Sequence, residues 1–285
     1  MTEPLETIKS YIGRSETATD VVAASAIARL ATTLDVEQPA SAKGDPIPPG
    51  WYGAFFPPLS GPSGMRVDGT AAGGGIMPPV PLPRRRLGGV RTSFHEPLRI
   101  GDEITRVSEI ADIRVDRDAS GALVLVVERN RISNARGLAV VEERDLIYLS
   151  EGRPEWTPTP PPAVPAEAVW RRVIEPNPVL LFRFCAVRFN SHRIHYDREY
   201  TTKVEGLPGL VVPATLISQL LMEMCRGQLP TRKLTYFGYQ TVRPMYDTGS
   251  FTIAGAPVAE GREAALWAVA ADQKLAMTAI ARFSQ

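Results

Sequence analysis

Two closely spaced histidines are the residues of this chain best suited to proton transfer. The sequence contains three histidines, and His192 and His195 fall within four residues, followed directly by Tyr196 and Asp197. An imidazole titrates near neutral pH, so it can serve both as a general base and as a general acid. Because these titratable groups stand in an otherwise apolar part of the chain, we expect a site for acid–base chemistry here.

A helix is predicted immediately after this polar stretch, over residues 213–226. Pro213 suits a first helical turn, Gly227 suits a helix end and Pro230 follows it. Apolar residues recur at helical spacing, at Leu216, Ile217, Leu220, Leu221 and Met224. The free N–H groups at the start of this helix point back towards the polar stretch. They are natural donors to an anionic or developing oxyanion group.

Length and composition limit the classes of protein to which the chain can belong. At 285 residues it is long for one compact domain, which favours two domains or a duplicated fold. Its 32 basic and 31 acidic residues nearly cancel, which argues against nucleic acid or an anionic membrane as the main partner. Neither a metal-binding cluster nor a glycine-rich nucleotide loop is visible, so we expect no metal and no organic cofactor.

The cysteines and the apolar runs indicate a compartment. Cys185 and Cys225 are too few for a disulfide framework, and we expect both to be reduced and buried. No run approaches the roughly 18 apolar residues of a membrane span, and the first residues lack the pattern of a signal peptide. These features predict a soluble cytoplasmic protein.

A helix followed by antiparallel strands is predicted twice along the chain. Residues 19–35 predict an Ala-rich helix, and the Pro- and Gly-rich residues 44–89 predict an ordered segment that covers a surface or a cleft. Strand periodicity follows at residues 90–94, 103–115, 123–132 and 138–149, and after the second helix at 232–242, 250–258, 264–271 and 274–283. We therefore expect an α+β protein in which each half buries a helix in a curled sheet.

The clearest boundary is a proline-rich run from Pro154 to Pro165, which predicts a stiff linker. We expect an N-terminal domain over residues 1–152, a linker over 153–166 and a C-terminal domain over 167–285. No direct sequence repeat is visible, but the order of elements predicts two copies of one architecture that face each other. One such chain equals a dimer of single units, so both a lone chain and a homodimer are compatible with it.

Several stretches resemble the double hot-dog members of the MaoC-like hydratases and dehydratases, particularly hydroxyacyl-thioester dehydratase type 2 and the mesaconyl-CoA and itaconyl-CoA hydratases. They are IGR (12–14), PPVPLPRRRLGG (78–89), FNSHRIHYDREY (189–200), EGLPGLVV (205–212) and VRPMYDTGSF (242–251). The resemblance implies a double hot-dog fold. It also implies an N-terminal copy that shapes the acyl-thioester tunnel without catalytic residues, and a C-terminal copy that carries the hydratase motif.

The family pattern is an Asp, a His five residues later and an Asp two further on, which places Asn190, His195 and Asp197 at those positions. The resemblance implies that His195 is the general base and acid. Asn190 departs from the pattern, and because an amide cannot accept a proton, it can only orient water or the imidazole. Backbone N–H groups near Ala214 would donate to the thioester oxygen, although this chain has Pro213-Ala214 where the family often has His-Gly.

Further residues are candidates for substrate contact. Arg84 and Arg85, with Arg86, could bind the phosphates of coenzyme A, or could be an exposed charge run. We assign Arg243 to a carboxylate or phosphate contact. Candidates closer to the motif are Gly209, Val211, His192 and Asp197.

Some of these residues have a structural interpretation that we prefer. We expect His192 to support the site, Asp197 to cap a short helix, and Glu223, on the predicted helix, to be a solvated or paired side chain. Gln240 stands where we expect arginine in many relatives, which favours a neutral acyl chain over a dicarboxylyl group.

The sequence therefore predicts a hydro-lyase of acyl-thioester or fatty acid metabolism, which hydrates a 2-enoyl-CoA or dehydrates a 3-hydroxyacyl-CoA. Two alternatives stay open, an acyl-CoA thioesterase and a hot-dog protein that binds an acyl thioester without turnover. The acyl group, its stereochemistry and the choice between coenzyme A and a carrier protein are also open.

Overall fold

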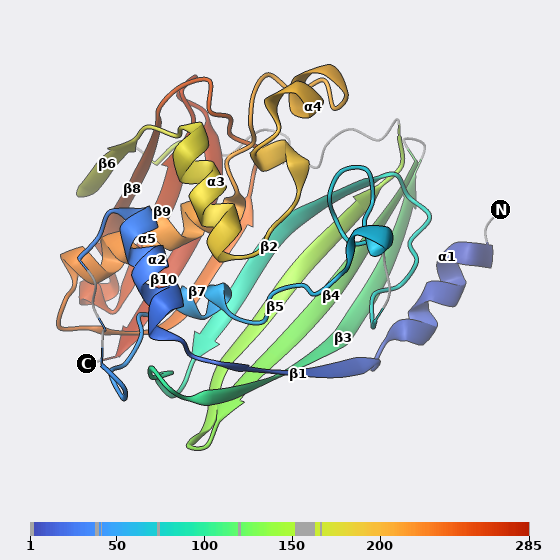
Figure 1. Cartoon of the computed structure of the whole chain (residues 1–285). Coiled ribbons are helices and arrows are strands. Elements are labelled where there is room, and N and C mark those ends of the chain that lie inside the picture. The colour runs from blue at the N-terminus through green and yellow to red at the C-terminus, as the bar shows by residue number, and fades with distance from the viewer. Residues whose placement is uncertain are drawn as a thin grey trace.

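The computed structural model describes residues 3–37, 40, 42–72, 75–118, 121–151, 163–165 and 167–284. Within these ranges, ten strands form one sheet in the order β1-β3-β4-β5-β2-β7-β10-β9-β8-β6 (Figure 1). The strands are β1 (Ser15–Val21), β2 (Arg84–Phe94), β3 (Glu103–Asp118), β4 (Gly121–Asn134), β5 (Gly137–Leu149), β6 (Trp170–Ile174), β7 (Lys233–Thr241), β8 (Phe251–Val258), β9 (Glu263–Val269) and β10 (Leu275–Ser284). The predicted α+β architecture with antiparallel strands is confirmed.

The two halves of the chain meet where β2 pairs with β7. Strands β1 to β5 precede this junction in the sheet and strands β6 to β10 follow it, in mirrored order. The antiparallel register places Val90 opposite Tyr239 and Thr92 opposite Phe237. A Cβ atom on Gly89 would lie 2.6 Å from the carbonyl oxygen of Tyr239, so this close approach of two backbones requires glycine.

The longest helix, α5 (Ala214–Gln228), confirms the helix predicted over residues 213–226. It lies against β7, β8, β9 and β10, and its Leu216, Leu220 and Leu221 are at most 3% exposed. Burial of each leucine contributes roughly 2 kcal/mol, so the apolar stripe embeds the helix in the sheet of the C-terminal half.

The helix predicted over residues 19–35 begins later than expected. Helix α2 spans Ala24–Leu34, because Ser15–Val21 forms β1 and pairs with β3. Thr17, Thr19 and Val21 are branched at Cβ and favour extended backbone. The prediction of a helix over this segment gave these residues too little weight. The prediction of the helix start was therefore wrong.

Three further short elements were not predicted, α1 (Glu3–Thr7), β6 and α3 (Pro178–Val187), whereas α4 (Arg198–Lys203) is the short helix that Asp197 was expected to cap. Helix α3 begins with a local signal that the sequence carries, since Asn177 Oδ1 accepts hydrogen bonds from Val179 N and Leu180 N at 3.0 Å each, and Pro178 takes the first helical position. The predicted linker at residues 153–166 lies mostly outside the described residues.

The segment between α2 and β2, here called the covering segment (residues 42–83), is irregular apart from two 3-10 turns, Trp51–Ala54 and Pro62–Gly64. Figure 1 shows it crossing in front of the N-terminal strands. It forms a small apolar core with the sheet, made of residues such as Ile76, Val80, Val124 and Tyr148. The predicted covering role is confirmed, but its end was placed too late, since β2 begins at Arg84.

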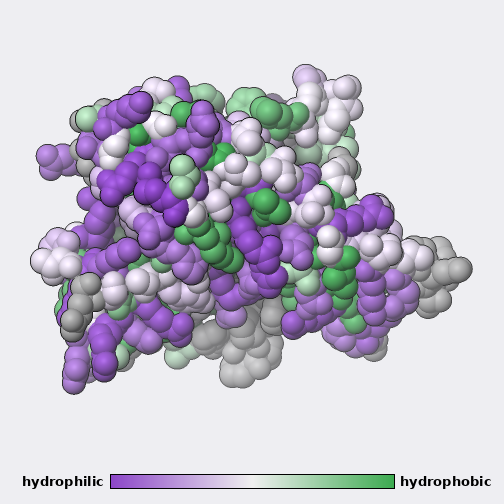
Figure 2. All heavy atoms as spheres, turned by 90° about the horizontal axis from the view of Figure 1, so that it is seen from below, coloured by the Kyte–Doolittle hydropathy of each residue, from purple (hydrophilic) through white to green (hydrophobic). Residues whose placement is uncertain are grey.

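Figure 2 shows mostly hydrophilic residues on the face seen from below, with hydrophobic residues in small separate groups. Of the helices that the structure describes, none is both long and apolar enough to cross a membrane.

Candidate active site

His195 ends a 3-10 turn, Arg193–His195, in the loop that joins α3 to α4, here called the histidine loop (residues 189–197). Its Nδ1 lies 2.8 Å from the carbonyl oxygen of Val211. A carbonyl only accepts, so Nδ1 carries the proton and Nε2 is left as the basic nitrogen. Burial lowers the pKa of His195 to about 4, although the Val211 carbonyl opposes this shift. At neutral pH the imidazole is therefore uncharged and able to accept a proton.

His192 packs edge to face against His195, with ring centroids 5.4 Å apart. Burial lowers the pKa of His192 as well, while the nearby Asp68 carboxylate acts in the opposite direction. The structure therefore places His192 against the imidazole of His195, as a supporting role requires.

Asn190 holds the turn that leads into the two histidines. Its Oδ1 accepts a hydrogen bond from His192 N at 3.1 Å, and its own N–H donates to the carbonyl of Cys185 at 2.8 Å. Among the described residues, no hydrogen bond joins Asn190 to His195. Its predicted role in orienting water or the imidazole therefore stays a prediction.

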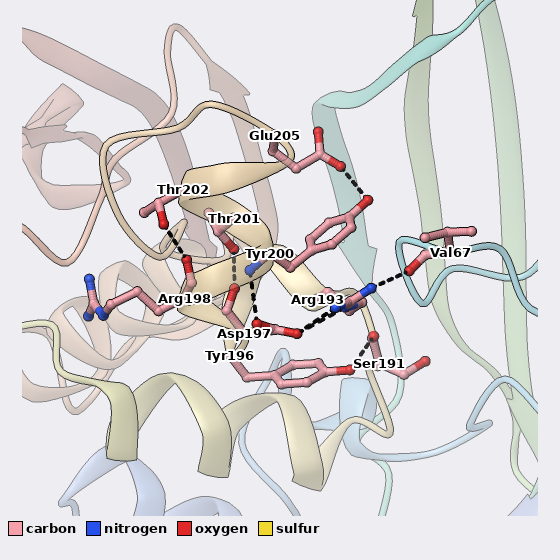
Figure 3. Close-up of polar contacts among 10 residues, drawn as sticks. All are labelled: Val67, Ser191, Arg193, Tyr196, Asp197, Arg198, Tyr200, Thr201, Thr202 and Glu205. Atoms are coloured by element: carbon pink, nitrogen blue, oxygen red, sulfur yellow. Dashed lines mark hydrogen bonds and ion pairs between the residues drawn. The ribbon is translucent and has the colours of Figure 1, made fainter.

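Both carboxylate oxygens of Asp197 accept hydrogen bonds from nearby residues of the chain (Figure 3). Its Oδ1 accepts from Tyr200 N at 3.0 Å and caps α4, while its Oδ2 accepts from Arg193 Nε and Nη2 at 3.0 and 2.8 Å. The Tyr200 N–H and the Arg193 guanidinium lower the pKa of Asp197. The helix-capping interpretation is confirmed, and its second predicted role, substrate contact, stays a prediction.

The covering segment of the N-terminal half binds the histidine loop directly. Arg193 N donates to the carbonyl of Asp68 at 2.8 Å, Arg193 Nη1 donates to that of Val67 at 3.0 Å, and Ser191 Oγ donates to that of Gly69 at 2.7 Å. Gly69 has a φ of +80°, and a Cβ atom there would lie 2.1 Å from Ser191 O. The sequence predicted a covering segment but not which residues it touches, because these contacts span more than 120 residues.

The start of α5 lies beside the histidine loop. Val211 N donates to Ile194 O at 2.9 Å, and the Val211 carbonyl holds His195. Ala214, three residues later, is the first residue of α5, and helical bonding begins only with Leu216 N and Ile217 N, which donate to Pro213 O. The N–H of Ala214 therefore precedes the helical ladder, as the predicted oxyanion donor must.

Asp247, whose role was not foreseen, anchors the stretch before α5. Its buried carboxylate accepts from Leu210 N at 2.8 Å and forms an ion pair with Arg198. A Cβ atom on Gly209 would lie 2.8 Å from Asp247 Oδ1, so glycine is needed for this approach. Gly209 thus has a structural reason for its identity, and its predicted substrate contact, like that of Val211, stays a prediction.

The candidate arginines lie at two places. Arg84 and Arg85 belong to β2 rather than to a loop, and the Arg85 guanidinium lies 5.9 Å from the Tyr148 ring centroid and acts electrostatically on His192. Arg243 is paired with Asp272 in the turn between β9 and β10, so its assigned contact stays a prediction. Gln240 is exposed and alternates with the buried Tyr239, so it points to the opposite face of the sheet. The expectation of a neutral acyl chain, which depended on Gln240, stays a prediction.

Glu223 and the two cysteines have structural environments, Glu223 and Cys225 near the end of α5 and Cys185 on α3. Glu223 Oε1 accepts from Trp51 Nε1 at 2.6 Å, and its Oε2 binds Arg226, which confirms a paired side chain. Cys185 and Cys225 are free and buried, as predicted, and burial raises the pKa of each thiol to about 12. A cavity of about 620 Å³ near Glu223 is lined by residues that include His95 but not His195.

Comparison with known proteins connects this geometry to a family. The model of hydroxyacyl-thioester dehydratase type 2 matches residues 50–247. The mesaconyl-C(4)-CoA hydratase of Chloroflexus aurantiacus is 37% identical over 248 residues, which cover 87% of this chain and 88% of that protein.

Solved structures with lower identity share the fold. A MaoC-like dehydratase from Phytophthora capsici has a TM-score of 0.71 and 11% identity, with 98% of both chains covered. A Mycobacterium tuberculosis protein with a double hot-dog fold has a TM-score of 0.57 and 14% identity, with 96% of both chains covered. The predicted double hot-dog fold is confirmed. The chain belongs to the hydroxyacyl-thioester dehydratase type 2 family and is, as predicted, a hydro-lyase.

Proposed function

We propose that the chain reversibly hydrates a 2-enoyl-CoA thioester, or dehydrates the 3-hydroxyacyl-CoA thioester, with His195 as general base and acid. The proposal depends mainly on the protonation state of the His195 imidazole. Its pKa of about 4 and its Nδ1 contact with Val211 O leave Nε2 as an unprotonated base at neutral pH. The relative from Chloroflexus aurantiacus is a hydratase of a CoA thioester, which supports the same reaction class.

In the hydration direction, Nε2 of His195 removes a proton from water while the water oxygen bonds to C3 of the acyl group. The π electrons of the C2–C3 bond move towards the thioester, whose oxygen gains negative charge. The N–H of Ala214, at the start of α5, would stabilise that oxygen. The protonated imidazole then delivers its proton to C2, so that one H and one OH have been added.

Two further residues have supporting roles in this proposal. Asn190 Oδ1 is already bound by His192 N, so the amide NH₂ would orient the attacking water. Arg84 and Arg85 would bind the phosphates of coenzyme A, because a guanidinium matches phosphate geometry and Arg85 is exposed near His192.

The test follows the ultraviolet absorbance of the enoyl thioester in crotonyl-CoA and mesaconyl-CoA. We expect the wild type to hydrate at least one of them, and His195→Gln to lower kcat/KM by roughly two to four orders of magnitude. His95→Gln is the matched control, since His95 lines the cavity near Glu223, which His195 does not line, and the change should leave the rate unchanged.

Other outcomes would contradict the proposal and identify the alternatives. Release of free thiol with the double bond intact would indicate a thioesterase. Tight binding of acyl-CoA without either reaction would indicate a binding protein. Circular dichroism of each variant separates loss of chemistry from loss of folding.

A further inference from the structure

A cavity lies towards the end of α5 that is remote from the histidine loop. Its volume is about 620 Å³, and residues of both halves line it where the end of β2 meets the start of β7. Met222 lines it from α5 and follows Ala214 by eight residues, which is about 12 Å along the helix. Since His195 is not among the lining residues, the cavity lies apart from the proposed site of hydration.

The interior of this cavity is apolar. Ile47, Leu98 and Val140 line it and are at most 6% exposed, and Leu234 lines it with 8% exposed. The described residues of its lining include no serine, threonine, asparagine or glutamine. A ligand with several hydroxyl or amide groups would therefore lose hydrogen bonds to water without replacing them. The interior suits a hydrocarbon chain instead.

The buried polar side chains of the lining already have partners within the protein. Tyr52 Oη donates to Glu142 Oε2 at 2.5 Å. Glu223 Oε1 accepts from Trp51 Nε1 at 2.6 Å, and its Oε2 accepts from Arg226 Nε at 2.7 Å. Because these groups are bound to one another, recognition of a polar ligand group falls to the charged side chains nearer the mouth.

The lining carries an excess of positive charge. Besides Arg226, its basic side chains are Arg99, Arg232 and Lys233. Glu223 is paired with Arg226, which leaves Glu96 as the acidic side chain that could balance the other three among the described lining residues. An anionic ligand group is therefore favoured over a neutral or cationic one.

Arg232 and Lys233 are placed to hold that anionic group. Arg232 N donates to Leu229 O at 3.1 Å, which fixes its backbone, while its half-buried guanidinium has no hydrogen bond or ion pair with a described residue. Lys233 is exposed, and its Nζ donates to the carbonyl of His95 at 3.3 Å, which leaves its charge unbalanced. A carboxylate at the mouth would give both cations a counter-ion.

We propose that this cavity is a second ligand site, which binds an aliphatic monocarboxylate of the medium-chain fatty acid type. The hydrocarbon chain lies against Ile47, Leu98 and Val140, and the carboxylate binds Arg232 and Lys233. The site is distinct from the acyl-thioester site near His195. It stands independently of the proposed function, since no part of the argument uses the hydration chemistry.

The test titrates the full chain with decanoate and with decanol, which share a hydrocarbon chain and differ in charge. By calorimetry, we expect the wild type to bind decanoate more tightly than decanol. Arg232→Gln should weaken decanoate binding by roughly 10-fold, as expected for loss of a charged hydrogen bond, and should leave decanol binding unchanged. Arg232→Lys keeps the charge and should retain most of the affinity.

The matched control is Arg29→Gln, an exposed arginine of α2 that does not line the cavity and should bind both ligands as the wild type does. Val140→Phe narrows the interior and should weaken both ligands alike, with circular dichroism to confirm its folding. The comparison of Arg232→Gln with Arg232→Lys decides the matter even if Val140→Phe fails to fold.

Three results would overturn the inference. They are no binding of decanoate by the wild type, unchanged decanoate affinity in Arg232→Gln, and displacement of bound butyryl-CoA by decanoate, which would make the cavity part of the thioester site. If the chain hydrates no enoyl thioester but binds decanoate through Arg232, the proposed function fails and the second ligand site stands.

Discussion

The two halves of this protein share a strand order but cover their strands differently. The C-terminal half lays α5 against β7 to β10. The N-terminal half lays the irregular covering segment on its strands instead, while α2 packs on α3 and on the Trp51–Ala54 turn. The helix offers free N–H groups at its start and a rigid base for the histidine loop. The covering segment offers backbone carbonyls and glycines, which can follow a neighbour closely.

The two halves therefore have different roles in the proposed function. The C-terminal half holds His195 and Ala214, which do the proposed chemistry. The N-terminal half holds the histidine loop through Val67, Asp68 and Gly69. The N-terminal half thus contributes contacts that position the histidine loop, while the C-terminal half contributes the proposed catalytic groups. This comparison of the two halves can be tested by substitutions that weaken the contribution of one half at a time.

The largest effect should come from Gly69→Ala, which breaks the contact of the covering segment with the histidine loop. The new methyl group would lie 2.1 Å from Ser191 O on a residue with a φ of +80°, which should cost roughly 4 kcal/mol of stability. We expect a matching fall in the melting temperature and in kcat. Gly64→Ala is the control, because no atom lies within 4 Å of its Cβ position. Equal melting temperatures of the two variants would contradict the docking role.

The pH dependence of stability should report the burial of His195. Its folded pKa of about 4 lies below the value of 6.5 for a histidine exposed to water, so the unfolded chain binds the proton more readily. Stability should therefore be fully present above pH 6.5 and fall by about 3 kcal/mol as the pH drops towards 4, with a smaller contribution of the same sign from His192. Urea unfolding between pH 4 and 7 measures it. His195→Gln should flatten the slope, and His95→Gln should retain it.

Asp247→Ala should test whether the stretch before α5 depends on one buried carboxylate. The change leaves Leu210 N without its acceptor and Arg198 without its ion pair, so we expect a loss of about 2 kcal/mol. Thermal unfolding is the measurement. Glu199→Ala removes only the exposed pair with Lys203 and should change stability by less than about 0.5 kcal/mol. Comparable losses in the two variants would show that Asp247 is no anchor.

The smallest effect should come from Trp51→Phe, which removes a hydrogen bond between the halves. Glu223 would lose the indole donor at 2.6 Å but keep Gln219 and Arg226, so we expect a loss of about 1 kcal/mol. Since its partner Glu223 lies nine residues along α5 from Ala214, kcat should change little. A large fall in kcat with unchanged stability would mean that the two ends of α5 are coupled.

Much of the C-terminal half was predictable because its signals are local. The helix over residues 213–226 follows from an apolar stripe bounded by proline and glycine, and most strand ranges follow from alternation between turn signals. The capping role of Asp197 was also predicted, since it depends on Tyr200, three residues away. The edge strand β1 and helix α3 were missed although both carry short signals, Cβ-branched residues and an Asn-Pro start.

Only the tertiary structure decided which distant residues meet. The spacing of Gly69 and Ser191 does not predict their contact, because it forms only when the two halves fold over each other. The spacing of Asp247 and Leu210 does not predict theirs either, because it forms only when the C-terminal half folds. The sequence by itself determined most of the strands, the helix over residues 213–226, the family and the candidate histidine. The tertiary structure decided which nitrogen of His195 carries the proton and which residues surround the ring, because burial and long-range hydrogen bonds exist only in the folded chain.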